Sequence, residues 1–173
     1  MNEPVSRIVK VLSGGQSGAD RGAMDAARQC GVDVGGWCPA GGWAEDFPTP
    51  PGVLALYPEL LETPSDDVIQ RTEWVIRDSS CCIVFNTHAA GTSRGTDAGY
   101  MFYEKYDTPN WTFLLGEPDS YGEQVQEIID WLNGLDDDAI VVGIGGPRAS
   151  EYDGIYDIVF SVVTAILDEL AER

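Results

Sequence analysis

Residues 8–21 read IVKVLSGGQSGADR, a short apolar run that passes through a glycine-rich turn into a helical pattern. The run Ile8 to Leu12 has the length and the β-branched composition of a buried strand. A helix of about Gly18 to Cys30 follows, with small residues along one side that allow close packing on a sheet. A strand that enters a helix through a tight turn is typical of an α/β fold.

The alternation of strands and helices continues along the chain. Further buried strands are predicted at Cys81 to Phe85, Trp111 to Leu115 and Ala139 to Val142. Helices are predicted at Asp66 to Asp78, from about Thr96, at Ser120 to Gly134 and at Ile155 to Leu170. Buried strands joined by helices imply right-handed crossovers, so we expect a three-layer α/β sandwich with a mainly parallel sheet of about five strands.

The segment Gly35 to Pro64 breaks this alternation, because it is dense in proline, glycine and tryptophan. We interpret it as a long ordered loop with one short strand near Val53 to Tyr57, and loops of this length are often functional. The chain has 173 residues and shows no linker or internal repeat. This length predicts a single domain over residues 1–173.

The charge of the chain excludes several classes of partner. Ten Lys and Arg residues stand against 29 Asp and Glu residues, which gives a net charge of −19. So acidic a surface repels phosphate polymers and anionic lipid, so we expect neither a nucleic-acid polymer nor a membrane as partner. Solubility or a salty cytoplasm explains the acidity, and a cation-binding function is the alternative.

The cysteines and the hydropathy pattern indicate the cellular compartment. Four cysteines form no Cys-x-x-Cys pair, and with a single histidine they give no zinc spacing, so no metal site is expected. Neither a signal peptide nor an apolar run of membrane-spanning length is present in the sequence. We therefore expect free thiols and a cytoplasmic location.

Three glycine-rich turns follow predicted strands, at residues 13–21, 86–97 and 143–151. Ligands bind outside the carboxyl ends of parallel strands, and the backbone N–H groups at a helix start favour an anion. We expect one shared pocket for a phosphate or another oxyanion, although each turn alone is also explained as an ordinary strand-to-helix connection. The candidate binding residues in the turns are Gly14, Gly15, Gln16, Ser17, Gly18, Asp20, Arg21, Gly91, Thr92, Gly95, Thr96, Gly145, Gly146 and Arg148.

Five of the eight arginines lie in or near these turns: Arg21, Arg71, Arg77, Arg94 and Arg148. In a chain so poor in cations this distribution indicates a local anion site, with Arg21 and Arg148 as counter-charges and Arg71 and Arg77 as further candidates. The alternative is that the arginines only pair with surplus carboxylates.

Two further segments are candidates for the same site. The predicted helix Asp66 to Asp78 has an apolar face and a polar face, and Arg71 and Trp74 fall on the polar one. A tryptophan there indicates contact with the ligand loop or with a partner chain, and a simple cover over the core is the alternative. Glu45 and Asp46 follow a tryptophan-rich segment and are candidates for acid/base catalysis or for ribose or metal binding.

Several motifs together carry a resemblance to a known family. They are SGGQSGADR, GGWCPAG with AED, ETPS followed by QRTEWVIRDS, then GT, and finally GGPRASE with GIY, which span Ser13 to Tyr156. This set resembles the putative molybdenum carrier family, the circularly permuted YpsA-like branch of the Rossmann-like SLOG, or lysine-decarboxylase-like, superfamily. The resemblance implies a Rossmann-like sandwich that binds a nucleotide or a nucleotide-derived ligand, with the molybdenum cofactor (molybdopterin) as one candidate.

The resemblance also implies an alternative activity. Related enzymes cleave the N-glycosidic bond of nucleoside monophosphates with a GGxGTxxE motif, but here Gly99 stands where that motif has its glutamate. Our leading hypothesis is therefore a binding protein for a phosphate-bearing, nucleotide-like small molecule. The alternatives are a nucleotide glycosidase that uses Glu45 or Asp46, and a ligand-sensing homo-oligomeric module; we expect a dimer or a tetramer.

Overall fold

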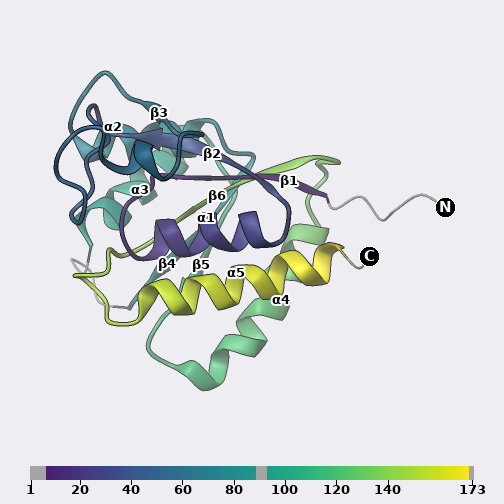
Figure 1. Cartoon of the computed structure of the whole chain (residues 1–173). Helices are drawn as coiled ribbons and strands as arrows, with labels where there is room; N and C mark the ends of the chain where they lie inside the picture. Colours follow the sequence, from purple (N-terminus) through teal and green to yellow (C-terminus); the bar gives the residue numbers. More distant parts are fainter. Residues whose placement is uncertain (1–6, 89–92, 172–173) are drawn as a thin grey trace.

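A computed structural model describes residues 7–88 and 93–171 and shows one parallel sheet between two layers of helices (Figure 1). The strands are β1 (Ile8–Ser13), β2 (Asp33–Cys38), β3 (Leu61–Glu62), β4 (Cys81–Asn86), β5 (Asn110–Leu114) and β6 (Ile140–Gly145). Their order in the sheet is β3-β2-β1-β6-β4-β5. The predicted α/β sandwich is confirmed, with six strands rather than about five, all of them parallel.

The helices divide between the two faces of the sheet (Figure 1). They are α1 (Ala19–Gln29), α2 (Val68–Arg77), α3 (Arg94–Lys105), α4 (Tyr121–Asn133) and α5 (Ile155–Ala171). Helices α1, α4 and α5 pack together on one face, and α2 packs with α3 on the other. No described helix is both long and apolar enough to cross a lipid bilayer.

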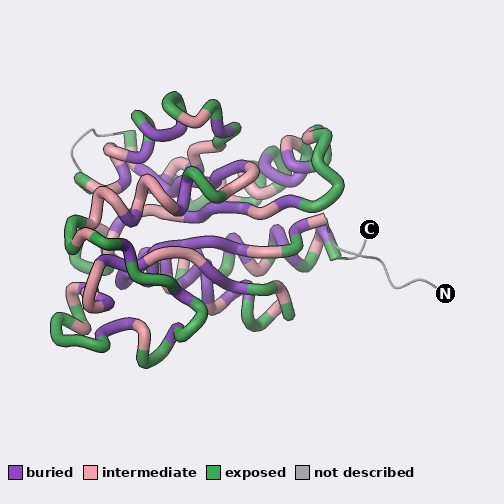
Figure 2. Tube along the Cα trace, turned by 90° about the horizontal axis from the view of Figure 1, so that it is seen from above, coloured by how far each residue is buried: buried purple, intermediate pink, exposed green. Residues whose placement is uncertain are grey.

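The core lies where the sheet meets these layers, and buried segments run through the middle of the molecule in Figure 2. All six residues of β4 are buried, as expected for a strand covered on both faces. Helix α1 approaches α5 closely because its inner side is small: a side chain at Gly22 would lie 2.6 Å from the carbonyl oxygen of Tyr156. The small-residue stripe of α1 therefore lets two helices share one face of the sheet.

The segment 35–64 differs from expectation. The prediction of a strand near Val53 to Tyr57 was wrong. A 3₁₀-helix (Gly52–Ala55) lies there, and the short strand β3 follows it. Strand β2 was not predicted, since its sequence DVGGWC is poor in strand-forming residues. Pairing with β1 holds it in the sheet, with Ser13 opposite Gly36.

Gly36 is required for this pairing. It adopts φ +129°, and a Cβ there would overlap the carbonyl oxygen of Ser13. We expect Gly36→Ala to lower the free energy of unfolding by about 3 kcal/mol, because strained backbone and overpacking act together. Urea denaturation followed by circular dichroism measures the change.

The matched control is Gly122→Ala in α4, where no atom lies within 4 Å of the new methyl group. The free energy of unfolding should stay the same or rise by up to about 1 kcal/mol. Equal stability of the two variants would contradict the close approach of β1 and β2.

Candidate functional site

A pocket opens at the carboxyl ends of β1 and β6, and it extends along β4 between α2 and α3. We call it the central pocket; the volume inside it that the centre of a water molecule can occupy is about 70 Å³. All three glycine-rich turns contribute to its wall. The lining residues are Gly14, Gln16, Asp20, Val68, Arg71, Thr72, Val75, Ile76, Cys82, Val84, Ser93, Gly95, Thr96, Gly99, Tyr103, Gly143, Ile144, Gly145, Gly146, Arg148 and Glu151.

The first and third turns are joined directly. Gly18 adopts φ +80°, and a Cβ there would lie 2.6 Å from the backbone nitrogen of Ala149. The Ala19 N–H donates to the carbonyl oxygen of Pro147 at 3.1 Å, and the Ala149 N–H donates to the Ser17 hydroxyl at 3.2 Å. Glycine at position 18 therefore lets the third turn lie against the start of α1.

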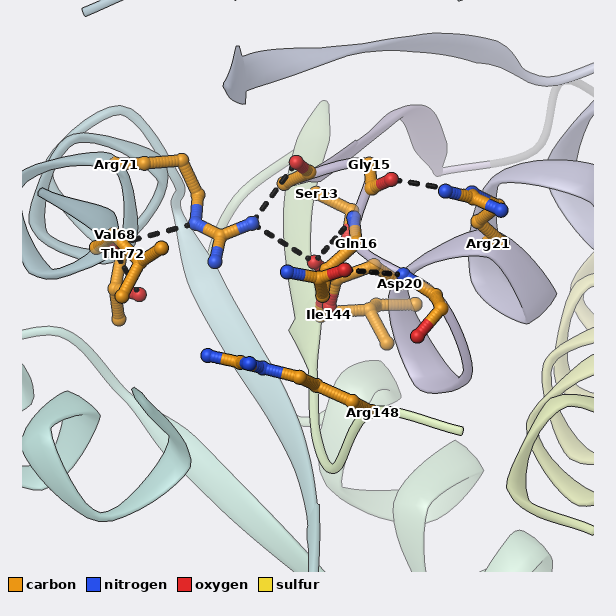
Figure 3. A network of polar contacts seen from close by, with 12 residues as sticks. Ser13, Gly15, Gln16, Asp20, Arg21, Val68, Arg71, Thr72, Ile144 and Arg148 are labelled. Atoms are coloured by element: carbon orange, nitrogen blue, oxygen red, sulfur yellow. Dashed lines mark hydrogen bonds and ion pairs between the residues drawn. The ribbon is translucent and has the colours of Figure 1, made fainter. Parts of the chain in front are cut away.

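Gln16 presents an unpaired donor to the pocket. Its side-chain oxygen accepts hydrogen bonds from the backbone N–H groups of Ser17 and Glu45, both at 3.0 Å. These bonds fix the orientation of the amide, because its nitrogen cannot accept them. The Nε2 atom is buried without a hydrogen-bond partner in the described part of the chain, and Figure 3 shows it facing the space between Arg71 and Arg148.

Arg71 and Asp20 form a buried ion pair beside Gln16 (Figure 3). Arg71 Nη1 lies 3.3 Å from Asp20 Oδ2 and 2.9 Å from the carbonyl oxygen of Gly14, and the Gln16 N–H also donates to Asp20. Burial raises the pKa of Asp20, although Arg71 pulls it down. Burial likewise lowers the pKa of Arg71, Asp20 opposes this shift, and the nearby Arg148 charge adds to it.

Arg71, a predicted candidate for the anion site, lines the pocket, but its expected place away from the buried side of the helix was wrong. The residue is 7% exposed, and its guanidinium meets the chain just after the end of β1, at the carbonyl oxygen of Gly14. A Cβ at Gly14 would lie 2.5 Å from Arg71 Cδ, so this glycine makes room for the guanidinium. Periodicity did not indicate this arrangement, because the partner of Arg71 comes from another helix.

Arg148 reaches the pocket from the third turn (Figure 3). Its guanidinium carbon lies over the ring of Trp43, 5.4 Å from the ring centroid, within the distance of about 6 Å at which a cation and an aromatic ring attract each other. Its Nε lies 3.9 Å from Glu151 Oε1, at the limit of an ion pair. Both guanidinium groups line the pocket, and the charge of Arg148 disfavours that of Arg71 because like charges repel.

The second turn contributes the start of α3. The Ser93 hydroxyl caps the helix by accepting from the Thr96 N–H at 3.4 Å, and Gly95 and Thr96 line the pocket. Gly91 and Thr92 lie outside the described residues. Gly145 and Gly146, as expected, line the pocket from the third turn.

Two predicted arginines, Arg21 and Arg77, and three predicted turn residues, Gly15, Ser17 and Gly18, do not line the pocket. Arg21 binds both carboxylate oxygens of Asp46, at 2.5 and 2.7 Å, and its Nε donates to the carbonyl oxygen of Gly15. Arg77 pairs with Asp78 on the surface and lies over the ring of Trp74, which packs edge-on against Trp37. The contacts of Arg21 and Arg77 are therefore to side chains and backbone outside the central pocket.

The two candidate acid/base carboxylates, Glu45 and Asp46, also do not line the pocket. Glu45 accepts from the hydroxyls of Ser17 and Ser150 and from the Ser150 N–H, so it links the first and third turns. Partial burial raises the pKa of Glu45, but these hydrogen bonds outweigh it and leave the pKa below its usual value. The hydrogen bonds from Arg21 lower the pKa of Asp46.

Sequence reasoning missed the apolar wall of the pocket. Val75 and Ile76 on α2, Val84 on β4 and Tyr103 on α3 line its inner end, and all four are buried. Their apolar character predicted core positions, but no local signal shows that two core-facing helices leave space between them. No cluster of three potential metal ligands occurs in the two described ranges.

The buried pair generates a stability prediction. Asp20→Asn should lower the free energy of unfolding by about 3–5 kcal/mol, because Arg71 would remain buried without its counter-charge. The control Glu59→Gln breaks the exposed pair with Arg28 and should cost less than about 1 kcal/mol. Urea denaturation at pH 7 measures both, and equal costs would contradict the role of the buried pair.

Comparisons with known proteins agree with this architecture. The model of the circularly permutated YpsA SLOG family matches residues 11–167. A solved structure from Syntrophus aciditrophicus, named "Putative molybdenum carrier protein", superimposes with a TM-score of 0.79 at 30% identity and covers 94% of this chain and 96% of its own. No curated protein gives a significant match. Since the family model covers most of the sequence, the chain belongs to the circularly permutated YpsA SLOG family.

Proposed function

We propose that this protein binds a small, phosphate-bearing, nucleotide-derived molecule in the central pocket. The observation that carries the proposal is the convergence of three donors on one space: the guanidinium groups of Arg71 and Arg148 and the unpaired amide nitrogen of Gln16. An oxyanion between them would relieve the repulsion of the two cations and complete the hydrogen bonding of the amide.

The start of α3 supports the same assignment. Gly95 and Thr96 stand at the first turn of a twelve-residue helix that opens on the pocket, where backbone N–H groups and the helix dipole favour negative charge. Gly145 and Gly146 line the pocket from the third turn. An anion in the pocket would therefore find hydrogen-bond donors both at the start of the helix and on the side chains.

The molybdenum cofactor is a specific ligand within this class. The name of the Syntrophus aciditrophicus protein supports it, and the pterin of that cofactor carries a phosphate. Arg71, Arg148 and Gln16 fit that phosphate, and the cofactor would supply its own dithiolene to hold the metal. This chain would then bind and shield the cofactor.

Binding is better supported than glycosidic cleavage. Glu45 and Asp46 are both engaged in hydrogen bonds outside the pocket. The carboxylates in the pocket lining are Asp20, which is paired with Arg71, and Glu151, which lies beside Arg148. Assay of free base from nucleoside monophosphates tests the alternative, and sustained release would favour the enzyme.

Two wider expectations belong to the same proposal. We propose a cytoplasmic location, which the four free cysteines support. We also propose a dimer or a tetramer, supported by exposed Tyr100 and Met101 on α3. Light scattering with and without nucleotide measures the oligomeric state, and a monomer in both conditions would contradict it.

Removal of Arg148 tests the proposed site. Arg148→Ala should weaken binding of AMP and of inorganic phosphate at least tenfold, because a charge-assisted hydrogen bond contributes about 1.5–3 kcal/mol. Isothermal titration calorimetry measures the affinities.

The matched control is Arg77→Ala, which removes the same charge outside the pocket. It should leave both affinities unchanged within about twofold. Arg77 lies on the surface outside the pocket, where water and salt screen its charge. Absence of binding by the wild-type protein to nucleoside monophosphates, inorganic phosphate and the molybdenum cofactor would overturn the proposal.

A further inference from the structure

Gly99 stands inside α3 without a packing reason. A glycine inside a helix costs about 0.5–1 kcal/mol relative to alanine. A Cβ at this position would meet Tyr103 Oη at 3.5 Å and Ile76 Cδ1 at 3.6 Å, which are ordinary contact distances. Gly22 of α1 differs, because there a Cβ would lie 2.6 Å from a backbone oxygen. The effect of glycine at 99 is to leave space in the pocket that it lines.

The space beside Gly99 is apolar. Val75 and Ile76 face it from α2 and Val84 from β4, and these residues are between 2% and 8% exposed. An apolar group of a ligand gains about 25 cal/mol for each Å² of its own surface that it buries in such an environment. The inner end of the central pocket therefore favours an apolar group, whereas its outer end has the charged donors.

Tyr103 places one polar atom in this apolar end. The residue is 8% exposed, and its hydroxyl has no hydrogen-bond partner among the described residues. Burial raises the pKa of Tyr103 well above its ordinary value, so the hydroxyl stays protonated and is able to donate. The hydroxyl is not one of the buried polar atoms that lack a partner, so it is open to the pocket that Tyr103 lines, where an acceptor on a ligand can reach it.

We propose that the inner end of the central pocket is a second subsite, formed by Gly99, Tyr103, Val75, Ile76 and Val84, for a ring on the ligand. This inference rests on the proposed function, because the phosphate at Arg71 and Arg148 anchors the same molecule. The ligand class is an aromatic or heteroaromatic ring joined to a phosphate, with a hydrogen-bond acceptor at the far edge of the ring. The Tyr103 hydroxyl donates a hydrogen bond to that acceptor, and the missing side chain at Gly99 leaves space for the ring.

The test compares inorganic phosphate with phenyl phosphate, the smallest probe that joins a ring to the anion. Phenyl phosphate should bind the wild-type protein at least tenfold more tightly, as measured by isothermal titration calorimetry. Gly99→Leu should abolish this advantage and leave the affinity for inorganic phosphate unchanged within twofold. The milder Gly99→Ala, which introduces no clash, should reduce the advantage in part.

A matched control is Gly122→Leu in α4, an exposed helix position with no atom near the new Cβ. It should alter neither affinity. Tyr103→Phe should weaken binding of 4-nitrophenyl phosphate, whose nitro group offers an acceptor, at least threefold more than binding of phenyl phosphate. Thermal melting of each variant confirms that it is folded.

The outcomes separate the two proposals. Equal wild-type affinities for phosphate and phenyl phosphate would overturn the ring subsite and leave phosphate binding supported. The ring subsite would also be overturned if Gly99→Leu and Gly99→Ala each changed the affinity for phosphate and the affinity for phenyl phosphate by the same factor. The ring would then lie elsewhere. Failure of the wild-type protein to bind any of the probes would overturn both proposals.

Discussion

The buried ion pair between Asp20 and Arg71 joins the two helix layers at the carboxyl edge of the sheet. Asp20 belongs to α1 on one face and Arg71 to α2 on the other, and they meet at 3.3 Å over the end of β1. Taking both charges out of water is costly, and the pair persists because the Gly14 carbonyl and the Gln16 N–H complete its hydrogen bonding. The glycine at 14, the path of the first turn and the orientation of α2 all depend on this contact.

Glu45 stabilises the first and third turns through hydrogen bonds from the long segment after β2. Its carboxylate holds Ser17 and Ser150, and its backbone N–H holds the side-chain oxygen of Gln16. The long segment after β2 is therefore a strap across the first and third turns, and it determines which end of the Gln16 amide faces the pocket. A carboxylate that sequence reasoning considered for proton transfer thus stabilises the geometry of a binding site.

The predictable part of the fold is the part in which local pattern and tertiary environment agree. Strand β4 and helix α5 are long apolar patterns, and both lie within one residue of their expected limits. Strand β2 was missed because its glycines weaken any local preference, and only its neighbour β1 makes it a strand. Tyr103 was overlooked, and the burial of Arg71 was not expected, for a related reason: their environments come from helices distant in the sequence, so no helical periodicity reveals them.

The net charge of the chain is −19, but the charge of the pocket cannot be read from this composition. Arg71 and Arg148 each have a carboxylate nearby, Asp20 and Glu151, so the charged side chains in the described lining sum to zero. A compensated pocket in a negative field does not steer anions from a distance. Affinity must then arise at short range, from directed hydrogen bonds and from the apolar inner wall. Such a site discriminates by shape and donor geometry, which is why a strongly acidic surface and an anion-binding pocket are compatible in one small protein.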